Sequence, residues 1–414
     1  MPRSLANRLR PEDRPAHDWY RFVLSYPPHL VRDYLARFGV GAGGAVLDPF
    51  CGTGTTLVEC KRLGVASVGF EANPMAAFAA EVKTDWTPAP AALAAAAERV
   101  AATAERLAAA PALRALPDEA AALLLRGSIS PRPLHRALGL LAAIREQAAA
   151  GLARHAELAL ARVLVAGIGN LHFGPEVGVG PAKEDAPAVE LWRAAALAMA
   201  ADLEALAPGA ATPARVHRAD ARDVAALLAP ESLDAVITSP PYPNEKDYTR
   251  TTRLESVILG FVSTRAELRA LKQGLVRSNT RGVYAADTDD QLVAGHPVIA
   301  RVADEIEARR VALGKTSGFE RLYARVTRLY FGGMARHLAA LRPALRPGAR
   351  LAYVVGDQAS YLRVMIRTGQ LLASLADGLG YEVEGIDLFR TRLATATREQ
   401  LREEVVVLRW PGPR

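Results

Sequence analysis

The chain has 414 residues, of which 50% are hydrophobic and 23% are charged. This composition is typical of a globular protein with one large domain or two to three smaller ones, and no apolar run suggests a membrane span. The net charge of +7 is compatible with binding a polyanion such as nucleic acid. The 2 cysteines and 8 scattered histidines predict neither a disulfide framework nor a metal site, and they fit a cytoplasmic location.

Residues 1–44 contain one predicted helix. Apolar residues recur at helical spacing up to Phe38, and Pro27 and Pro28 predict where this helix begins. Gly39 predicts its end. A helix in this position is well placed to cover a ligand held by the turn that follows.

Residues 45–63 predict a buried strand, a glycine-rich turn and a helix. The turn reads DPFCGTGTT over residues 48–56. Gly52 and Gly54 let backbone N–H groups approach a ligand, because glycine adopts positive φ and carries no Cβ. A single Gly-x-Gly also occurs in purely structural turns, which is the alternative reading of this stretch.

The next predicted strand, residues 67–70, ends at an acid. Glu71 lies 19 residues after Gly52 (71 − 52). In doubly wound α/β proteins, an acid at this place accepts hydrogen bonds from ribose hydroxyls. The alternative is a helix-capping acid, but the whole strand–turn–helix–strand order favours a nucleoside-binding βαβ unit.

Residues 87–212 interrupt the α/β alternation. They are rich in Ala, Leu, Glu and Arg, which predicts several helices divided by prolines. Residues 167–181 are glycine-rich, and we expect an ordered loop there. Its Asn170, His172 and Phe173 could line a substrate cleft, or the loop could be a simple connector.

The alternation resumes at residue 213. A strand over residues 233–238 runs directly into Ser239, Pro240, Pro241 and Tyr242. Two consecutive prolines can neither continue a central strand nor begin a helix freely, so they hold the backbone extended. This places the loop at the carboxyl edge of a sheet, where α/β ligand sites lie.

The remaining sequence predicts a basic segment, a long helix and three strands. Residues 263–283 carry five basic residues and one acid, a net +4 (5 − 1), which predicts either a polyanion contact or a solvated helix face. An amphipathic helix over 321–345 precedes a buried strand over 351–355. Residues 381–386 and 404–408 are strand-like, and such a pair commonly forms an edge hairpin in a mixed sheet.

These segments divide the chain into three parts. Residues 1–86 hold an N-terminal helix and the first half of an α/β domain, and 87–212 form a helical insertion with a potential role in substrate recognition. Residues 213–414 hold the second half, with a basic insertion near 262–320. We expect a mixed central sheet with helices on both faces.

The turn and the Ser-Pro-Pro-Tyr loop together resemble the S-adenosylmethionine-dependent DNA amino-methyltransferases, which modify cytosine N4 or adenine N6. The resemblance covers roughly 20–85 and 213–261, with weaker support over 321–410, and it implies a Rossmann-like methyltransferase fold. It also implies S-adenosyl-L-methionine as cofactor. The methionine end would lie over the turn, Glu71 would take the ribose hydroxyls, and Asp220 or Asp223 would lie near the adenine. The implied cofactor residues are Asp48, Pro49, Phe50, Gly52, Gly54, Thr55, Glu71 and Asp220.

The same resemblance implies the chemistry. Ser239 Oγ and the Pro240 carbonyl would accept hydrogen bonds from the target amino group, which frees its lone pair, and Tyr242 would stack on a flipped base. This mechanism needs no covalent intermediate, so Cys51 is not expected to be a nucleophile. Ser at the first loop position favours cytosine N4 over adenine N6. The implied catalytic residues are Ser239, Pro240, Pro241 and Tyr242, and the substrate candidates are Asn244, Asp247, Tyr248, Arg250, Arg269, Lys272 and Arg277.

The expected partner is double-stranded DNA with its target base flipped out, and a cognate restriction enzyme is a further candidate; no membrane partner is expected. Two alternatives stay open: a tRNA guanine-N2 methyltransferase, which usually carries Asp in place of Ser239, and a non-catalytic nucleic-acid-binding protein. A dinucleotide oxidoreductase is disfavoured because Leu57 occupies the third glycine position.

Overall fold

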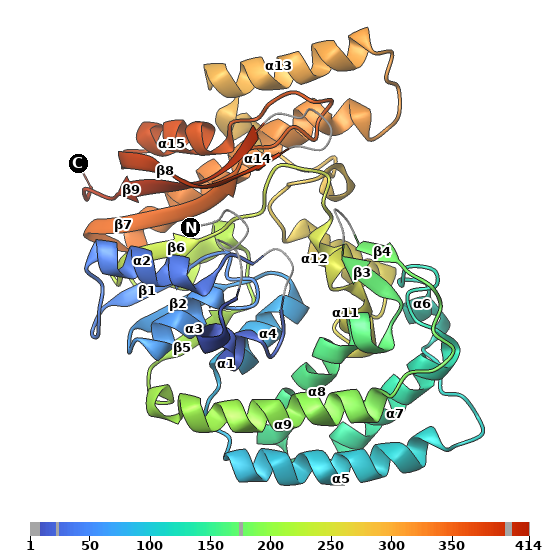
Figure 1. Ribbon diagram of the computed structural model, residues 1–414. Helices are drawn as coiled ribbons and strands as arrows, with labels where there is room; N and C mark the ends of the chain where they lie inside the picture. Colours follow the sequence, from blue (N-terminus) through green and yellow to red (C-terminus); the bar gives the residue numbers. More distant parts are fainter. Residues whose placement is uncertain (1–8, 22–24, 174–176, 394–399, 414) are drawn as a thin grey trace.

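The computed structural model describes residues 9–21, 25–173, 177–393 and 400–413. Its centre is a seven-stranded sheet in the order β5-β2-β1-β6-β7-β9-β8 (Figure 1). β5, β2, β1, β6 and β7 are parallel, whereas β9 and β8 join as an antiparallel pair at one edge. The predicted mixed sheet and edge hairpin are confirmed. The strands are β1 Ala45–Asp48, β2 Ala66–Phe70, β5 Ala214–His217, β6 Leu233–Thr238, β7 Leu345–Gly356, β8 Glu382–Leu393 and β9 Gln400–Arg409.

Helices cover both faces of this sheet because alternate strand residues are apolar on both sides. Val46 and Ile237 pack against α2 (Pro28–Phe38), in a cluster that also holds Cys60 of α3 (Thr55–Arg62). Leu47 and Val236, one residue away on the same strands, pack in the cluster that holds α14 (Tyr323–Leu341) and α15 (Thr368–Gly378). The predicted α/β architecture is therefore confirmed.

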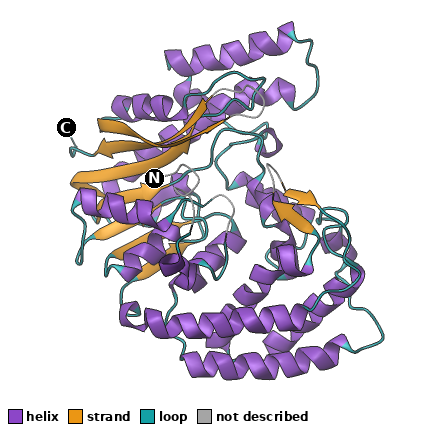
Figure 2. Ribbon diagram, viewed as in Figure 1, coloured by secondary structure: helices purple, strands orange, loops and turns teal. Residues whose placement is uncertain are grey.

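Between β2 and β5 the chain leaves the sheet, first through α4 (Pro74–Thr84) and then through a long helical region (Figure 2). This region contains α5 Pro90–Ala108, α6 Asp118–Ala121, α7 Pro131–Gln147, α8 Ala150–Val163 and α9 Ala188–Leu206. The other helices are α1 Arg14–His17, α10 Tyr248–Thr251, α11 Arg253–Ile258, α12 Arg265–Gln273 and α13 Pro297–Ala312. The short 3-10 segments are Pro11–Asp13, Ala207–Gly209, Ala221–Ala226, Thr280–Gly282, Asp289–Val293, Glu320–Leu322 and Arg342–Ala344.

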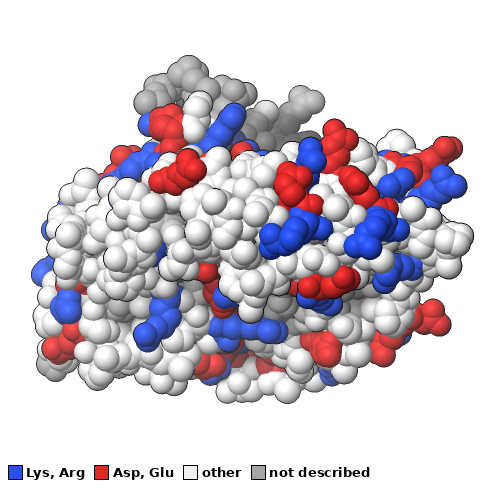
Figure 3. All heavy atoms as spheres, turned by 90° about the horizontal axis from the view of Figure 1, so that it is seen from below, with Lys and Arg blue, Asp and Glu red and all other residues white. Residues whose placement is uncertain are grey.

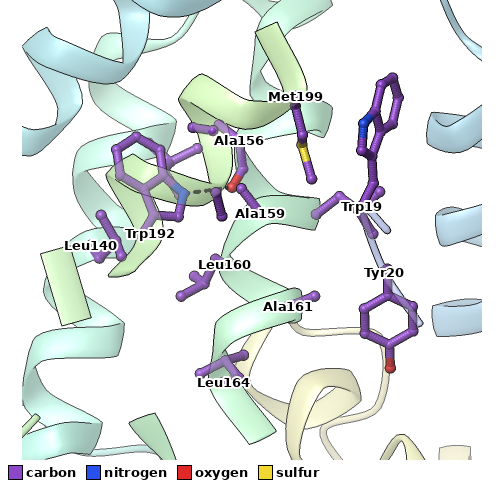
Figure 4. Close-up of a cluster of buried hydrophobic side chains, with 14 of the residues drawn as sticks. Trp19, Tyr20, Leu140, Ala156, Ala159, Leu160, Ala161, Leu164, Trp192 and Met199 are labelled. Carbon is purple, nitrogen blue, oxygen red and sulfur yellow. Dashed lines mark hydrogen bonds between the residues drawn. The ribbon is translucent and has the colours of Figure 1, made fainter. Parts of the chain in front are cut away.

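The helical region shares its core with the N-terminal segment. Trp192 of α9 is fully buried, and its Nε1 donates to the carbonyl of Ala156 at 2.8 Å (Figure 4). Trp19 lies in the same cluster and donates from Nε1 to Asp202 of α9 at 2.8 Å. The helical region is therefore packed against the sheet domain through a continuous apolar core, and its division from that domain at residues 87 and 212 remains a proposal.

The structure corrects the expected loop at residues 167–181. Leu164–Ile168 forms a π-helical turn, and β3 (Leu171–Phe173) pairs antiparallel with β4 (Val177–Val179). Buried Asn170 fixes the start of this hairpin, since its Nδ2 donates to the Gly127 carbonyl and its Oδ1 accepts from the backbone of Lys183. The sequence signal was too short for two three-residue strands. Among the described helices, none has both the length and the hydropathy that crossing a bilayer requires.

Candidate active site

A cavity of about 550 Å³ opens at the carboxyl ends of β2, β1 and β6. It brings together the glycine turn, the acid after β2, Asp220 and the Ser-Pro-Pro-Tyr loop, which come from distant parts of the sequence. The predicted residues that line it are Pro49, Phe50, Gly52, Thr55, Glu71, Asp220, Ser239, Pro240, Pro241, Tyr242, Asn244, Asp247, Tyr248, Lys272 and Arg277. Four predicted residues are absent from its lining: Asp48, Gly54, Arg250 and Arg269.

The turn between β1 and α3 requires both of its glycines. Gly52 has φ 51° and Gly54 has φ 84°, a region that costs other residues about 1–2 kcal/mol. A Cβ at Gly54 would lie 3.1 Å from the Cα of Ala80, so α4 packs directly on the turn. Gly54 therefore shapes the turn and lets α4 pack closely against it, while Gly52 faces the cavity.

Asp48 has a structural position, which corrects its expected role as a cofactor contact. It is fully buried and accepts hydrogen bonds from Thr238 Oγ1 at 2.6 Å and Tyr26 Oη at 2.9 Å. Burial raises its pKa to about 6, although these hydrogen bonds and that from the Phe50 backbone act in the opposite direction. Asp48 thus joins β1 to β6 and to the segment before α2.

Glu71 holds the turn from the cavity side. Its Oε2 accepts from the Gly52 backbone N–H at 3.0 Å, and its Oε1 accepts from that of Asn73 at 2.7 Å. Burial is the main cause that raises its pKa to about 7. A buried carboxylate that faces a cavity and retains free lone pairs is well suited to accept ribose hydroxyls.

The structure separates the two acids proposed near the adenine. Asp220 lines the cavity and forms an ion pair with Arg222, whose Nη2 lies 2.6 Å from Oδ2. Asp223 is exposed and pairs with Arg336 at 2.9 Å, and it is not part of the lining. The position of Asp220 at the end of β5 is therefore the better match to an adenine site.

The Ser-Pro-Pro-Tyr loop leaves β6 and packs against the end of β7. Ser239 Oγ donates to the Val354 carbonyl at 3.0 Å, so its lone pairs remain as acceptors. The Tyr242 ring packs on Gly356, where a Cβ would be only 2.9 Å from the ring. The Tyr242 backbone N–H donates to Tyr248 Oη at 3.2 Å. Burial raises the pKa of Tyr242 well above its usual range and that of Tyr248 to about 12, so both rings are neutral phenols.

The expected substrate residues fall into two groups. Asn244, Asp247, Tyr248 and Lys272 line the cavity, and Lys272 Nζ pairs with Asp247 at 2.7 Å. Burial would raise the pKa of Asp247, but this ion pair lowers it. Arg250 and Arg269 lie outside the lining, and the Arg269 guanidinium lies over the Tyr284 ring at 5.4 Å.

Arg277 requires a correction. Although it borders the cavity, it is 5% exposed and pairs with Asp287 at 2.8 Å. Its guanidinium also donates to the carbonyls of Lys272 and Gln273, at 2.9 and 3.1 Å. These partners occupy the guanidinium, so it organises the loop after α12 and is not the exposed phosphate contact that its sequence context suggested.

Several lining residues were missed by sequence reasoning. Ser25 and Tyr26 border the cavity beside the turn, and Glu403 reaches it from the edge hairpin. Behind the lining, His337 of α14 is buried with its ring centroid 5.1 Å from that of the lining residue Phe50, and it hydrogen-bonds Tyr353 Oη at 2.7 Å. Burial lowers the pKa of His337 to about 4, so it is neutral. Among these residues, only Ser25 and Tyr26 had a signal in the sequence, because Pro27 and Pro28 directly after them mark the start of a helix.

Parts of the chain are similar to known methyltransferases. Residues 11–81 match the family model described as DNA methylase, N6_N4_Mtase. The chain is 33% identical over 82 residues to the type II methyltransferase M.BsoBI of Geobacillus stearothermophilus, covering 20% of this chain and 16% of that one. It is 27% identical over 195 residues to the type II methyltransferase M.AvaI of Anabaena variabilis, covering 43% and 38%.

A third relative is named as an enzyme that acts on RNA. The tRNA (guanine(10)-N2)-dimethyltransferase of Methanothermobacter thermautotrophicus is 43% identical over 63 residues, covering 15% of this chain and 18% of that one. The matches therefore span well under half the length of each of these three relatives. Among solved structures, TrmN from Thermus thermophilus gives a TM-score of 0.30 at 14% identity, over 97% of this chain and 54% of that one. Residues 11–81, which include the glycine turn, are thus similar to the N6/N4 family of DNA methylases, and the sequence relatives named above support an amino-methyltransferase of that family.

Proposed function

We propose that this protein transfers a methyl group from S-adenosyl-L-methionine to the exocyclic amino group of a base in DNA, with cytosine N4 as the favoured acceptor. The observation that carries the proposal is the single cavity in which Glu71 and the glycine turn face Ser239 and Tyr242. Residues 52 and 239 are 187 positions apart in the chain (239 − 52). The similarity of residues 11–81 to the DNA methylase family model supports the reaction class.

The cavity residues fit the proposed cofactor. Glu71 has lone pairs free for ribose hydroxyls, Asp220 borders the adenine end, and the turn presents backbone at Gly52. When bound, S-adenosylmethionine supplies an electrophilic methyl group on its sulfonium. Glu71 after β2 and Asp220 after β5 would hold the adenosine in the cavity that the loop after β6 also lines.

Ser239 and Pro240 fit the acceptor side. Because the Ser239 hydroxyl hydrogen is directed to the Val354 carbonyl, the oxygen presents lone pairs to an incoming amino group. The Pro240 carbonyl can accept the second N–H. Both hydrogen bonds would draw the amino nitrogen away from conjugation with the ring and so make its lone pair available as a nucleophile. On gaining a methyl group the nitrogen would release one proton to solvent and be neutral again.

Tyr242 is proposed to hold the base. Stacking on an aromatic side chain contributes about 1–3 kcal/mol per base, comparable to the cost of extruding a base from a duplex. The ring is fixed from behind by Gly356 and Glu403, which leaves a face for the base. The partner is therefore proposed to be double-stranded DNA, and the names of the type II relatives support a cognate restriction enzyme as a second partner.

RNA is the second candidate substrate, because one relative carries a tRNA dimethyltransferase name. Ser239, in place of the Asp that the tRNA enzymes usually carry, favours DNA. The deciding experiment incubates the protein with labelled S-adenosylmethionine and an equimolar mixture of unmodified DNA and RNA, followed by nucleoside mass spectrometry. We expect N4-methyl-2′-deoxycytidine, the nucleoside released from methylated DNA. N6-methyladenine in DNA would change the assigned base, and label confined to RNA would overturn the proposal.

A further inference from the structure

A second cavity of about 350 Å³ adjoins the first on the side of α2 and α4. The two cavities share Ser25, Tyr26, Thr53 and Thr55, so they meet at the start of α3, beside the glycine turn. Gly54 precedes α3 and provides no capping side chain. The shared wall is thus made of hydroxyl groups and the N-terminal end of a helix, both of which favour an anion.

The second cavity contains a buried lysine. Lys83 lies on the last turn of α4 and is 2% exposed. Ala80, three residues earlier, contacts Gly54, and residues three apart share a face of a helix, so Lys83 lies beside the turn. Within the described parts of the chain, no carboxylate lies within ion-pair distance of its Nζ.

The charged groups around Lys83 do not compensate for its burial. Burial lowers the pKa of Lys83 to about 7, and Asp18 acts on it only at longer range, opposed by Arg21. His17 shares the cavity, but its Nε2 is 2.8 Å from Glu59, and that carboxylate is also bonded by Arg32. A buried ammonium without a counter-ion is costly, and a carboxylate entering this cavity would remove much of that cost.

The first cavity indicates where such a carboxylate comes from. A nucleoside bound by Glu71 and Asp220 would lie in the same cavity as Gly52 and the shared wall, so its 5′ substituent could extend toward that wall. We propose that Lys83 is the counter-ion of the carboxylate at the methionine end of S-adenosylmethionine, which extends from the first cavity into the second. This inference rests on the proposed function, and it adds a cofactor-positioning residue that lies outside both sequence motifs.

The test compares two ligands that differ only in the carboxylate. Isothermal titration calorimetry measures the affinity of the full chain for S-adenosylhomocysteine and for its decarboxylated analogue, which keeps the amino group. In the unmodified protein we expect the carboxylate to raise affinity at least tenfold. Lys83→Met, which keeps the length and apolar stem of the side chain, should remove this preference and leave the affinity for the decarboxylated analogue within about twofold.

Lys61→Met is the matched control, because Lys61 is also a buried lysine on a neighbouring helix, with its Nζ on the carbonyls of Ala210 and Thr212. It should keep the ligand preference even if its melting temperature falls. Loss of affinity for both ligands in Lys83→Met, or a preference that is unchanged, would overturn the role of Lys83. If the unmodified protein binds neither adenosine compound, the proposed function itself fails.

A second measurement avoids the variant and so does not depend on its folding. Titrations of the unmodified protein at pH 7.5 in two buffers of different ionisation enthalpy give the protons taken up on binding. Asp18, Arg21 and Cys51 act on Lys83, and His17, which is paired with Glu59, shares its cavity. Among these groups, the ligand carboxylate is proposed to pair with Lys83. A nearby carboxylate raises the pKa of Lys83, so the protein should take up more protons when it binds S-adenosylhomocysteine than when it binds the decarboxylated analogue. Equal uptake by the two ligands would contradict the proposal.

Discussion

Two buried carboxylates beside the turn have different roles, although burial raises the pKa of both. The Asp48 oxygens are occupied by Tyr26, Thr238 and the Phe50 backbone. The Glu71 oxygens bond only to backbone N–H groups and border the cavity. Hydrogen bonds from a ligand's hydroxyls favour the ionised form of Glu71, so ligand binding and its ionisation are coupled.

We expect nucleoside affinity to rise with pH through about 7, because the pKa of Glu71 is raised to about 7 and the ionised carboxylate is the better acceptor. Methylthioadenosine is the suitable ligand, since it lacks the methionine end and therefore does not engage Lys83. Fluorescence or calorimetric titrations from pH 5.5 to 8.5 should show about a tenfold or greater rise. Glu71→Gln should flatten the profile, and a profile that is equally steep in this variant would exclude Glu71 as its source.

Ser239→Ala should lower the methyl-transfer rate by about 10²-fold, the usual effect of removing one positioned hydrogen-bonding group at a reacting centre. Its affinity for S-adenosylhomocysteine should be unchanged, since Ser239 contacts the acceptor side. Ser232→Ala is the control, because Ser232 precedes the opposite end of β6 and its hydroxyl donates to the Ala229 carbonyl. Single-turnover rates on DNA measure the effect, and an undiminished rate in Ser239→Ala would falsify the acceptor role.

At the scale of elements, α4 couples the turn to the second cavity. Its middle contacts Gly54 and its last turn carries Lys83. The position of the lysine therefore depends on how closely this helix packs on the turn. A glycine at position 54 is required for that close approach, in addition to its positive φ.

Gly54→Ala and Gly64→Ala separate these two requirements. Both glycines have positive φ, 84° and 72°, so alanine should cost each about 1–2 kcal/mol. Only Gly54 would bring its Cβ to 3.1 Å from Ala80, whereas nothing lies within 4 Å at Gly64. Urea unfolding should show the larger loss of stability for Gly54→Ala, together with weaker S-adenosylhomocysteine binding. Equal losses in the two variants would show that α4 adjusts freely.

At the scale of the whole molecule, the net charge of +7 does not form a basic patch on the surface that α5 and α9 contribute to. Figure 3 shows basic and acidic side chains interspersed on that face. The basic segment that begins with α12 is divided by the fold: Arg265, Arg269 and Arg281 are exposed, whereas Lys272 and Arg277 pair with Asp247 and Asp287. The exposed arginines are the ones suited to contact phosphates, and two of them lie on α12.

The double variant Arg265→Ala/Arg269→Ala should reduce the salt dependence of DNA binding. The slope of log affinity against log salt should fall by about 1.8, since each neutralised phosphate contributes about 0.9. Arg193→Ala on α9, which removes an exposed arginine that pairs with Glu98, should leave the slope unchanged. Binding isotherms between 50 and 200 mM salt test this. An unchanged slope in the double variant would show that this part of α12 is ordinary solvated surface.

The sequence by itself determined the α/β class, the antiparallel strand pair at the edge of the sheet, and the two loops of the site. Each follows from a local pattern: a β-branched run, two glycines before a helix, or two prolines after a strand. Glu71 was predictable for the same reason, because its distance from Gly52 reflects one strand–turn–helix–strand unit. The α2 boundaries at Pro28 and Gly39 were also found, since proline and glycine act within a single turn of chain.

Only the tertiary structure decided which charged residues are available to a ligand. Asp48 and Arg277 were assigned to ligand binding by position, but both are buried and paired, Asp48 with Thr238 from a distant strand and Arg277 with Asp287 across a folded loop. Asp220 was distinguished from Asp223, and Lys83 was recognised, by the same criterion of burial and pairing. Burial and pairing depend on residues that meet only when the sheet and the helical region assemble, so no local pattern in the sequence carries that information.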